Sequence, residues 1–135
     1  LAAIDAAGFT YGEASADATM PTKKGTYAMY AHGAWHTLAL KEPTQKLDVE
    51  SLQERLLDPV LGIKEPRTDP RISFAGNAQA TELEHLAGES GVAFALFPTS
   101  MEELMAISDA GGLMPPKSTW FEPKLLSGLV IRRIW

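Results

Sequence analysis

The residues best suited to bind a ligand lie in a proline-rich segment near the C-terminus, residues 114–124. Its sequence is MPPKSTWFEPK, which combines two cations, two hydroxyl groups and one carboxylate. Cations and hydroxyls are the donors that bind phosphate or carboxylate groups, and a carboxylate can orient a lysine or accept a proton. The pattern predicts an anion-binding loop; the alternative is a packed crossover in which Trp120 fills the space against a sheet and the lysines stay in solvent. The candidate ligand residues are Lys117, Ser118, Thr119, Glu122 and Lys124.

A charged loop at residues 64–71 holds a second group of candidate anion-binding residues. Its sequence, KEPRTDPR, contains two prolines and places Arg67 and Arg71 four positions apart. Guanidinium groups match the geometry of phosphate and carboxylate, so both arginines are secondary candidates for the same ligand. The alternative is an exposed loop that the prolines stiffen, with surface ion pairs that each contribute little to stability.

The remaining polar groups give weaker signals. His32 and His36 are four residues apart, but they span a predicted turn and strand rather than one helix face, so we predict no metal site. Ser100 begins a predicted helix, where free N–H groups favour anions. Because Glu102 and Glu103 in the first turn would repel an anion, we predict that Ser100 only caps the helix. No Ser–His–Asp arrangement or specific pair of carboxylates stands out, and the catalytic residues stay unassigned.

Composition and charge exclude several classes of function. The chain has 135 residues, 45% of them hydrophobic, and 12 basic against 17 acidic residues give a net charge of −5. An acidic domain lacks the basic surface that nucleic-acid binding requires. The lack of cysteine excludes disulfides, thiolate-ligated metals and thiol nucleophiles, and fits a cytoplasmic location. No apolar run approaches the roughly 20 residues of a membrane-spanning helix, so we expect no membrane partner.

Hydrophobic patterning and turn residues predict strands that alternate with helices. Aromatic and β-branched residues on both sides of His32-Gly33 predict a hairpin. A continuous apolar run at residues 92–97 predicts a buried strand. This order predicts an α/β or α+β fold, a two-layer sandwich in which helices pack on a mixed sheet of about five strands. The expected strands are 26–31, 34–40, 72–76, 92–97 and 129–131, and the expected helices are 1–7, 48–60, 81–88 and 100–110.

The length of the chain predicts a single domain, residues 1–135. Residues 1–24 are small and polar after an alanine-rich opening, which predicts an irregular or poorly ordered lead-in to a folded core at residues 25–135. The chain opens at Leu1 inside a predicted helix. We therefore interpret it as the C-terminal fragment of a longer protein.

Four segments, in order along the chain, resemble one known family. They are LDVESLQ and LDPVLGI within Leu47–Ile63, PRTDPRISF at Pro66–Phe74, VAFALFPTSMEEL at Val92–Leu104, and DAGGLMPPKSTWFEPKL at Asp109–Leu125. These segments are similar to the bacterial and archaeal family called domain of unknown function 1015, and the last is the most specific. The chain departs from the family pattern at Ser73, at residues 75–77 and at Leu126, where the family usually has an arginine beside the loop.

The resemblance implies a longer cytoplasmic protein whose upstream portion is a partner of this chain. Upstream portions of the family carry an Asp-Gly-His-His-Arg segment that is similar to the sulfiredoxin and ParB-like fold of free-serine kinases. This implies phosphoryl transfer on a small amino acid, with ATP or ADP and a divalent cation in the full-length protein. The segment is absent here, so we expect these residues alone to be inactive and to need no cofactor.

Two functions are therefore expected. In the first, this domain completes a phosphate- or nucleotide-type small-molecule site in an amino-acid kinase of the serine type, and binds a small phosphorylated ligand through the candidate residues. In the second, it is a non-catalytic structural or dimerisation module that supports the upstream domain, with a homodimer as its assembly.

Overall fold

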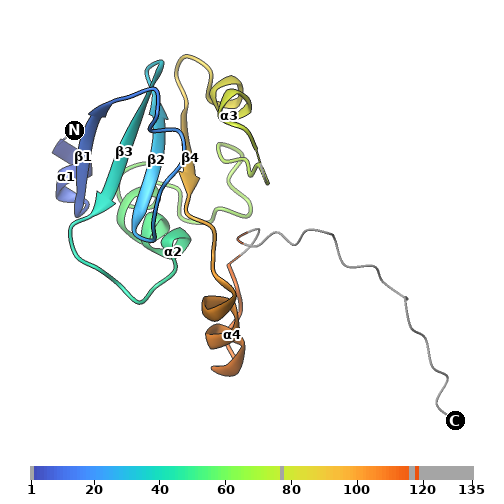
Figure 1. The fold of residues 1–135 in the computed structure, drawn as a ribbon. Coiled ribbons are helices and arrows are strands. Elements are labelled where there is room, and N and C mark those ends of the chain that lie inside the picture. The colour runs from blue at the N-terminus through green and yellow to red at the C-terminus, as the bar shows by residue number, and fades with distance from the viewer. Residues whose placement is uncertain (1, 77, 116–117, 119–135) are drawn as a thin grey trace, which may run out of the picture.

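The computed structural model describes residues 2–76, 78–115 and 118, and within them the chain forms one antiparallel sheet with helices on both faces. The order of the strands is β1-β3-β2-β4, and every adjacent pair is antiparallel (Figure 1). The strands are β1 (Phe9–Ala14), β2 (Thr26–Ala31), β3 (Ala34–Leu40) and β4 (Val92–Leu96). The helical segments are α1 (Ala2–Ala6), α2 (Asp48–Leu52), the π-helical turn η1 (Gln53–Leu57), α3 (Ala80–Ala87) and α4 (Met101–Asp109).

The predicted α+β class is confirmed, but the sheet differs from the expected one in two respects. It has four strands rather than five, and the described strands are antiparallel throughout instead of mixed. Residues 72–76 were expected to form a strand and do not. Residues 72 and 74 would share one face of a strand, but Ile72 packs on the main core while Phe74 is 42% exposed. The strand expected at residues 129–131 lies outside the described residues.

The expectation of an irregular lead-in over residues 1–24 is wrong for β1. This strand pairs with β3, with Phe9 opposite Leu40 and Tyr11 opposite Leu38. The Phe9 side chain is fully buried, and its ring meets the ring of Tyr27 edge-on at 5.5 Å. The strand is stabilised by contacts about 30 residues away in the sequence, so its own residues carry little local signal.

The predicted hairpin is confirmed as β2 and β3. Its two-residue turn is His32-Gly33, with φ angles of 51° and 80°. Positive φ at both central residues is the type I′ geometry, whose twist matches that of the two strands. His32 is the one non-glycine residue with positive φ in the described part of the chain, so the turn determines its backbone conformation.

The sheet has an apolar core on each face. On one face, side chains from all four strands pack against α2, η1 and the following loop, and Leu38, Leu52 and Leu56 are buried there. On the other face, Ala28, Trp35 and Ala95 pack with Leu83 of α3. Trp35 and Leu38 thus point to opposite faces, as the alternation of a strand predicts. None of the helices in the described residues is long and apolar enough to cross a membrane.

Candidate functional site

A cleft of about 240 Å³ lies between the α2–η1 helical segment, the loop that follows it and Pro115 of the proline-rich segment. Its floor is apolar and its rim carries charged side chains. The lining residues are Val49, Glu50, Gln53, Glu54 and Leu57 from the helical segment, Glu65, Pro66, Arg67, Ile72 and Phe74 from the loop, and Pro115. The cleft therefore brings together three of the four segments that carry the family resemblance.

The helical wall of the cleft follows from residue spacing. Val49, Gln53 and Leu57 lie four positions apart, which places them along one side of a helix, and Glu50 and Glu54 lie beside them. Leu52 and Leu56, on the neighbouring side, are buried against the sheet. The segment is thus anchored by one stripe of side chains and lines the cleft with the next.

The helix widens into a π turn where it meets the cleft. The N–H groups of Asp58 and Leu61 donate to carbonyls five residues earlier, those of Gln53 and Leu56. Pro59 has no N–H to donate to the carbonyl four residues before it, so a regular α-helical ladder cannot continue through this point. π-helical turns occur frequently at functional sites, and here both ends of the turn, Gln53 and Leu57, line the cleft.

Two side chains fold the loop back over the helix. Gln53 Nε2 donates to the carbonyl of Ile63 at 2.6 Å. Arg71 donates from Nη1 to the Leu61 carbonyl and from Nη2 to the Gly62 carbonyl, both at 3.1 Å. Arg71 also donates to Asp69 from Nε and Nη2, at 3.0 and 2.6 Å. These bonds close the loop into a fixed wall.

The same contacts explain the electrostatics of this loop. Side-chain hydrogen bonds from Arg71 lower the pKa of Asp69 to about 2. Asp69 and the two carbonyls engage all three nitrogens of the guanidinium. Arg71 was a candidate ligand residue from sequence, but its observed contacts make it a positioning residue for the loop.

Arg67 is the sequence-predicted residue that lines the cleft with its side chain exposed at the rim. In the described part of the chain, its guanidinium makes no hydrogen bond or ion pair, unlike that of Arg71. The rim carboxylates do have partners: Glu50 accepts from the Leu47 N–H, Glu54 pairs with Lys46, and Glu65 accepts from the Arg67 N–H. Arg67 is therefore the basic group at this rim that is available to an anion.

Of the five candidates in the proline-rich segment, the structure describes one. Ser118 is half-buried, and its hydroxyl donates to the Pro115 carbonyl at 2.7 Å. The Thr99 hydroxyl in turn donates to the Ser118 carbonyl at 3.4 Å. Ser118 thus joins Thr99, in the connection between β4 and α4, to Pro115, which lines the cleft. The other candidates, Lys117, Thr119, Glu122 and Lys124, lie outside the described residues.

A second polar group surrounds the start of α2, where the helix begins at Asp48 after Leu47. Instead of capping its own helix, the Asp48 carboxylate accepts from the N–H of Gly25 at 3.0 Å through both oxygens. Burial raises the pKa of Asp48, although the bond from Gly25 opposes that shift. Lys24, next in the chain, pairs with Glu103 of α4. These contacts connect the start of β2 with two helices.

The prediction that Ser100 caps α4 is confirmed, and Glu103 completes a capping box. The Ser100 hydroxyl accepts from the Glu103 N–H at 3.1 Å, and the Glu103 carboxylate accepts from the Ser100 N–H at 2.9 Å. Burial raises the pKa of Glu103, but hydrogen bonds from Lys24 and Ser100 outweigh it and hold the pKa below its ordinary value. The carboxylate occupies the helix N-terminus, so Ser100 acts as a cap and α4 has no vacant anion site there.

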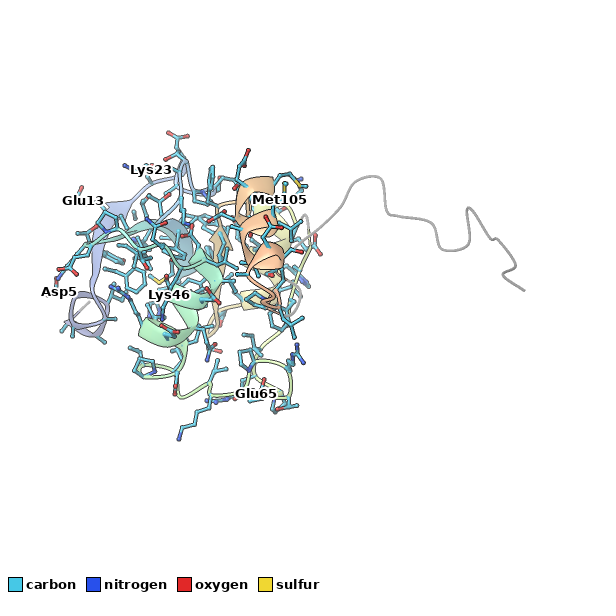
Figure 2. The ribbon with its side chains drawn as sticks, turned by 90° about the horizontal axis from the view of Figure 1, so that it is seen from below. Asp5, Glu13, Lys23, Lys46, Glu65 and Met105 are labelled. Carbon is cyan, nitrogen blue, oxygen red and sulfur yellow. The ribbon has the colours of Figure 1, made fainter. Side chains whose placement is uncertain are left out.

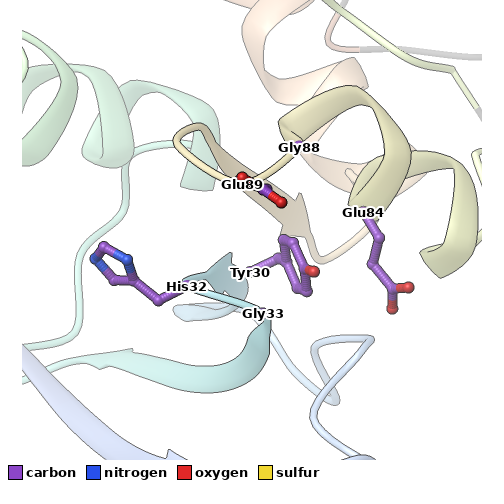
Figure 3. Close-up of a pocket in the computed structure, with 6 residues that line it drawn as sticks. All are labelled: Tyr30, His32, Gly33, Glu84, Gly88 and Glu89. Carbon is purple, nitrogen blue, oxygen red and sulfur yellow. The ribbon is translucent and has the colours of Figure 1, made fainter.

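A wider, shallow hollow of about 500 Å³ lies at the other end of β2, between the hairpin turn and the C-terminal end of α3 (Figure 3). Tyr30 and Glu89 both line it, whereas the His32 ring points away from them. Glu84, also in its lining, accepts from the indole N–H of Trp35 at 2.7 Å. This bond holds α3 on the sheet, which gives Glu84 a structural role. No three metal-ligating side chains gather anywhere in residues 2–76, 78–115 and 118.

Sequence reasoning found Arg67 but missed most of the cleft. Gln53 and Phe74 each end a segment that resembles the family, but neither was nominated as a ligand residue. The other available signal was the four-residue spacing of Val49, Gln53 and Leu57. That spacing becomes informative only when the loop is known to fold back on the helix. A scan against protein families gave no match to this chain, and neither curated proteins nor solved structures gave one.

Proposed function

We propose that this chain supplies part of a binding site for a phosphate- or nucleotide-type small molecule, within a longer protein of the kind that domain of unknown function 1015 represents. The activity of the whole protein would be phosphoryl transfer on a small amino acid of the serine type. The observation that carries the proposal is the apolar cleft with Arg67 at its rim, whose guanidinium has no partner among residues 2–76, 78–115 and 118.

The size and lining of the cleft support a divided site. A volume of about 240 Å³ falls below the roughly 300–1,000 Å³ of complete ligand pockets. It accommodates a single flat or branched apolar group between Leu57, Ile72 and Phe74, but not an entire nucleotide. The rest of the ligand would then lie outside the cleft, where the upstream portion of the protein would complete the site.

The charges of the rim favour one orientation of the ligand. Of the residues that the structure describes, three glutamates and one arginine line the cleft, so an anionic group is favoured on the side of Arg67. The apolar group of the ligand would enter the cleft and its phosphate would lie beside Arg67. Lys117 and Lys124, with the hydroxyls of Ser118 and Thr119, are the further phosphate-binding residues that the sequence nominates.

Binding of ATP, ADP, phosphoserine and serine tests the proposal, measured by thermal shift and by isothermal titration calorimetry on this chain and on the full-length protein. A ligand that binds the native state raises the melting temperature in a concentration-dependent way. Arg67→Gln should weaken binding of the phosphorylated ligands about tenfold, equivalent to about 1.4 kcal/mol. The matched control is Lys23→Gln, which removes the same charge at the end of the molecule opposite Glu65 of the rim (Figure 2).

The proposal fails if the full-length protein binds none of the phosphorylated compounds. It also fails if Arg67→Gln and Lys23→Gln weaken binding equally, because the effect would then come from net charge. Binding to the full-length protein alone, with a selective loss in Arg67→Gln, would support a site completed by the upstream portion.

The second candidate function is a non-catalytic structural or dimerisation module. The observation in its favour is the exposed apolar surface at β4, the last strand of the sheet within the described residues, where Leu86 is 55% and Val92 is 42% exposed. A homodimer through this surface predicts sedimentation as two chains, and Leu86→Glu should return it to one. Monomeric sedimentation of the unmodified chain would exclude this candidate.

A further inference from the structure

Helix α4 has an apolar side that the described part of the chain does not cover. None of its nine residues is buried, and Met101 and Met105, one turn apart, are 58% and 57% exposed. Leu113, just after the helix, is 93% exposed. Figure 1 shows α4 beyond the end of β4, away from the helices that pack on the sheet. We call Met101, Leu104, Met105 and Leu113 the α4 face.

A helix of this kind needs a covering partner. An isolated helix of nine residues is marginal in water, and helices in proteins owe most of their stability to burial of an apolar stripe. The Ser100–Glu103 capping box and the Lys24–Glu103 ion pair hold the N-terminal turn of α4. These contacts do not stabilise the later turns of the helix, where Met105 lies.

Charge indicates what the partner is. Residues 119–135 contain three basic residues and one acidic residue, whereas residues 1–118 contain nine basic and sixteen acidic ones. The C-terminal 17 residues therefore carry a charge of +2 and the rest of the chain −7. Glu102 and Asp109 of α4 are both exposed and acidic, and no basic residue occupies its last turn.

The composition and position of the same segment fit the α4 face. Nine of its 17 residues are large apolar ones, among them Trp120, Leu125 and Trp135. The segment follows Ser118, whose carbonyl accepts from Thr99 one residue before the cap of α4. Seventeen residues can span up to about 60 Å and α4 is about 14 Å long, so the segment can cover the helix from end to end.

We propose that residues 119–135 dock on the α4 face of the same chain, with apolar side chains against Met101, Met105 and Leu113 and basic side chains toward Glu102 and Asp109. The partner is thus this chain's own C-terminal segment and not a second protein. Docking would also fix the position of Lys124 on the domain. The docking proposal does not depend on the ligand proposed above.

Trypsin cleavage after Lys124 and after Arg132, followed by mass spectrometry of the full chain, tests the proposal. Cleavage depends on the undocked fraction, so the rate should be at least about tenfold lower than in a free peptide of residues 119–135. The double variant Met101→Glu, Met105→Glu should bring the rate to within about threefold of the peptide. The control is Met20→Glu, a methionine of similar exposure (55%) in the β1–β2 connection, which should leave the rate unchanged.

Both altered methionines are exposed, so the variant is expected to keep the fold, and circular dichroism checks it. A second variant, Glu102→Gln with Asp109→Asn, keeps the apolar contacts and should raise the rate by a smaller factor that falls with added salt. Cleavage of the unmodified chain at the peptide's rate overturns the proposal, as does equal protection in all variants. Carboxyl-to-amine cross-linking of a mixture of isotope-labelled and unlabelled chains distinguishes docking within one chain from docking between two. If the cross-links join only labelled to unlabelled chains, the C-terminal segment docks on a second copy, and docking within one chain is overturned.

Discussion

Phe9 and Phe74 provide a matched pair of substitutions that separates the core from the cleft. Phe9, the first residue of β1, is fully buried on the face of the sheet that α2 and η1 cover, in edge-on contact with Tyr27. Phe→Ala at such a position removes the transfer free energy of the ring and leaves a cavity, at a cost of about 3–5 kcal/mol. Phe74 lines the cleft and is 42% exposed, so its removal forfeits only part of the transfer term and opens no closed cavity. We expect about 1 kcal/mol there.

Urea unfolding at 25 °C, followed by circular dichroism, measures both free energies. A domain of this size has about 5–15 kcal/mol of stability, so Phe9→Ala removes a large share of it. If that variant does not fold, Phe9→Leu keeps part of the contact and should still destabilise more than Phe74→Ala. Ligand affinity should show the reverse order, because Phe74 contacts the cleft and Phe9 does not.

Equal losses of stability for the two phenylalanines would refute the reasoning. So would a loss below about 1.5 kcal/mol for Phe9→Ala, because a ring that is fully buried in the core cannot be removed at so little cost. A small loss for Phe9→Ala would mean that residues 9–14 do not form part of the sheet in solution, and that the irregular lead-in expected from sequence describes the chain better.

Two further predictions concern the loop that closes the cleft. Gln53→Ala removes the donor to the Ile63 carbonyl, so it should cost about 1–3 kcal/mol in urea unfolding and speed amide exchange in residues 61–72; an unchanged exchange rate would show that the bond does not hold the loop. Asp69 should titrate near pH 2 by carbon-13 NMR and return toward its ordinary value in Arg71→Gln. Because its folded pKa is lowered, the stabilisation is complete above the ordinary pKa near 3.8 and is lost as the pH falls through 2. A titration near pH 4 in the unmodified chain would contradict the Arg71 contacts.

Local features of the fold were predictable because neighbouring residues determine them. The type I′ turn at His32-Gly33, the Ser100–Glu103 capping box and the apolar strand β4 each depend on fewer than eight consecutive residues. The strand was expected to be buried, but only Ala93 and Ala95 are buried in it and Val92 is 42% exposed. The helix expected over residues 48–60 ends at Leu57, two residues before Pro59, whose ring and missing N–H stop a helix. These signals are sequence-local, so distant contacts did not override them.

The missed features depend on contacts between distant residues. The β1 strand is stabilised by β3, and Asp48 serves the Gly25 N–H rather than its own helix. The spacing of Thr81 and Glu84 is that of a capping box and misleads for the same reason, because α3 begins at Ala80 and Glu84 binds the Trp35 indole. A polar side chain near a helix start satisfies either the helix or a distant donor, and the sequence does not distinguish them.

The cleft itself illustrates how one local rule can have a distant consequence. Pro59 cannot donate an N–H, so the helix closes with bonds to the fifth residue back, and the wider turn puts Gln53 within 2.6 Å of the Ile63 carbonyl. That bond folds the loop toward the helix, and Arg71 then secures it through two further carbonyls and Asp69. With Arg71 so engaged, Arg67 is the arginine of the loop whose guanidinium remains at the rim of the cleft. The sequence does not distinguish the two arginines, but the way the helix ends gives them different roles. Arg71 holds the loop in place, and Arg67 is left at the rim, where it can bind a ligand.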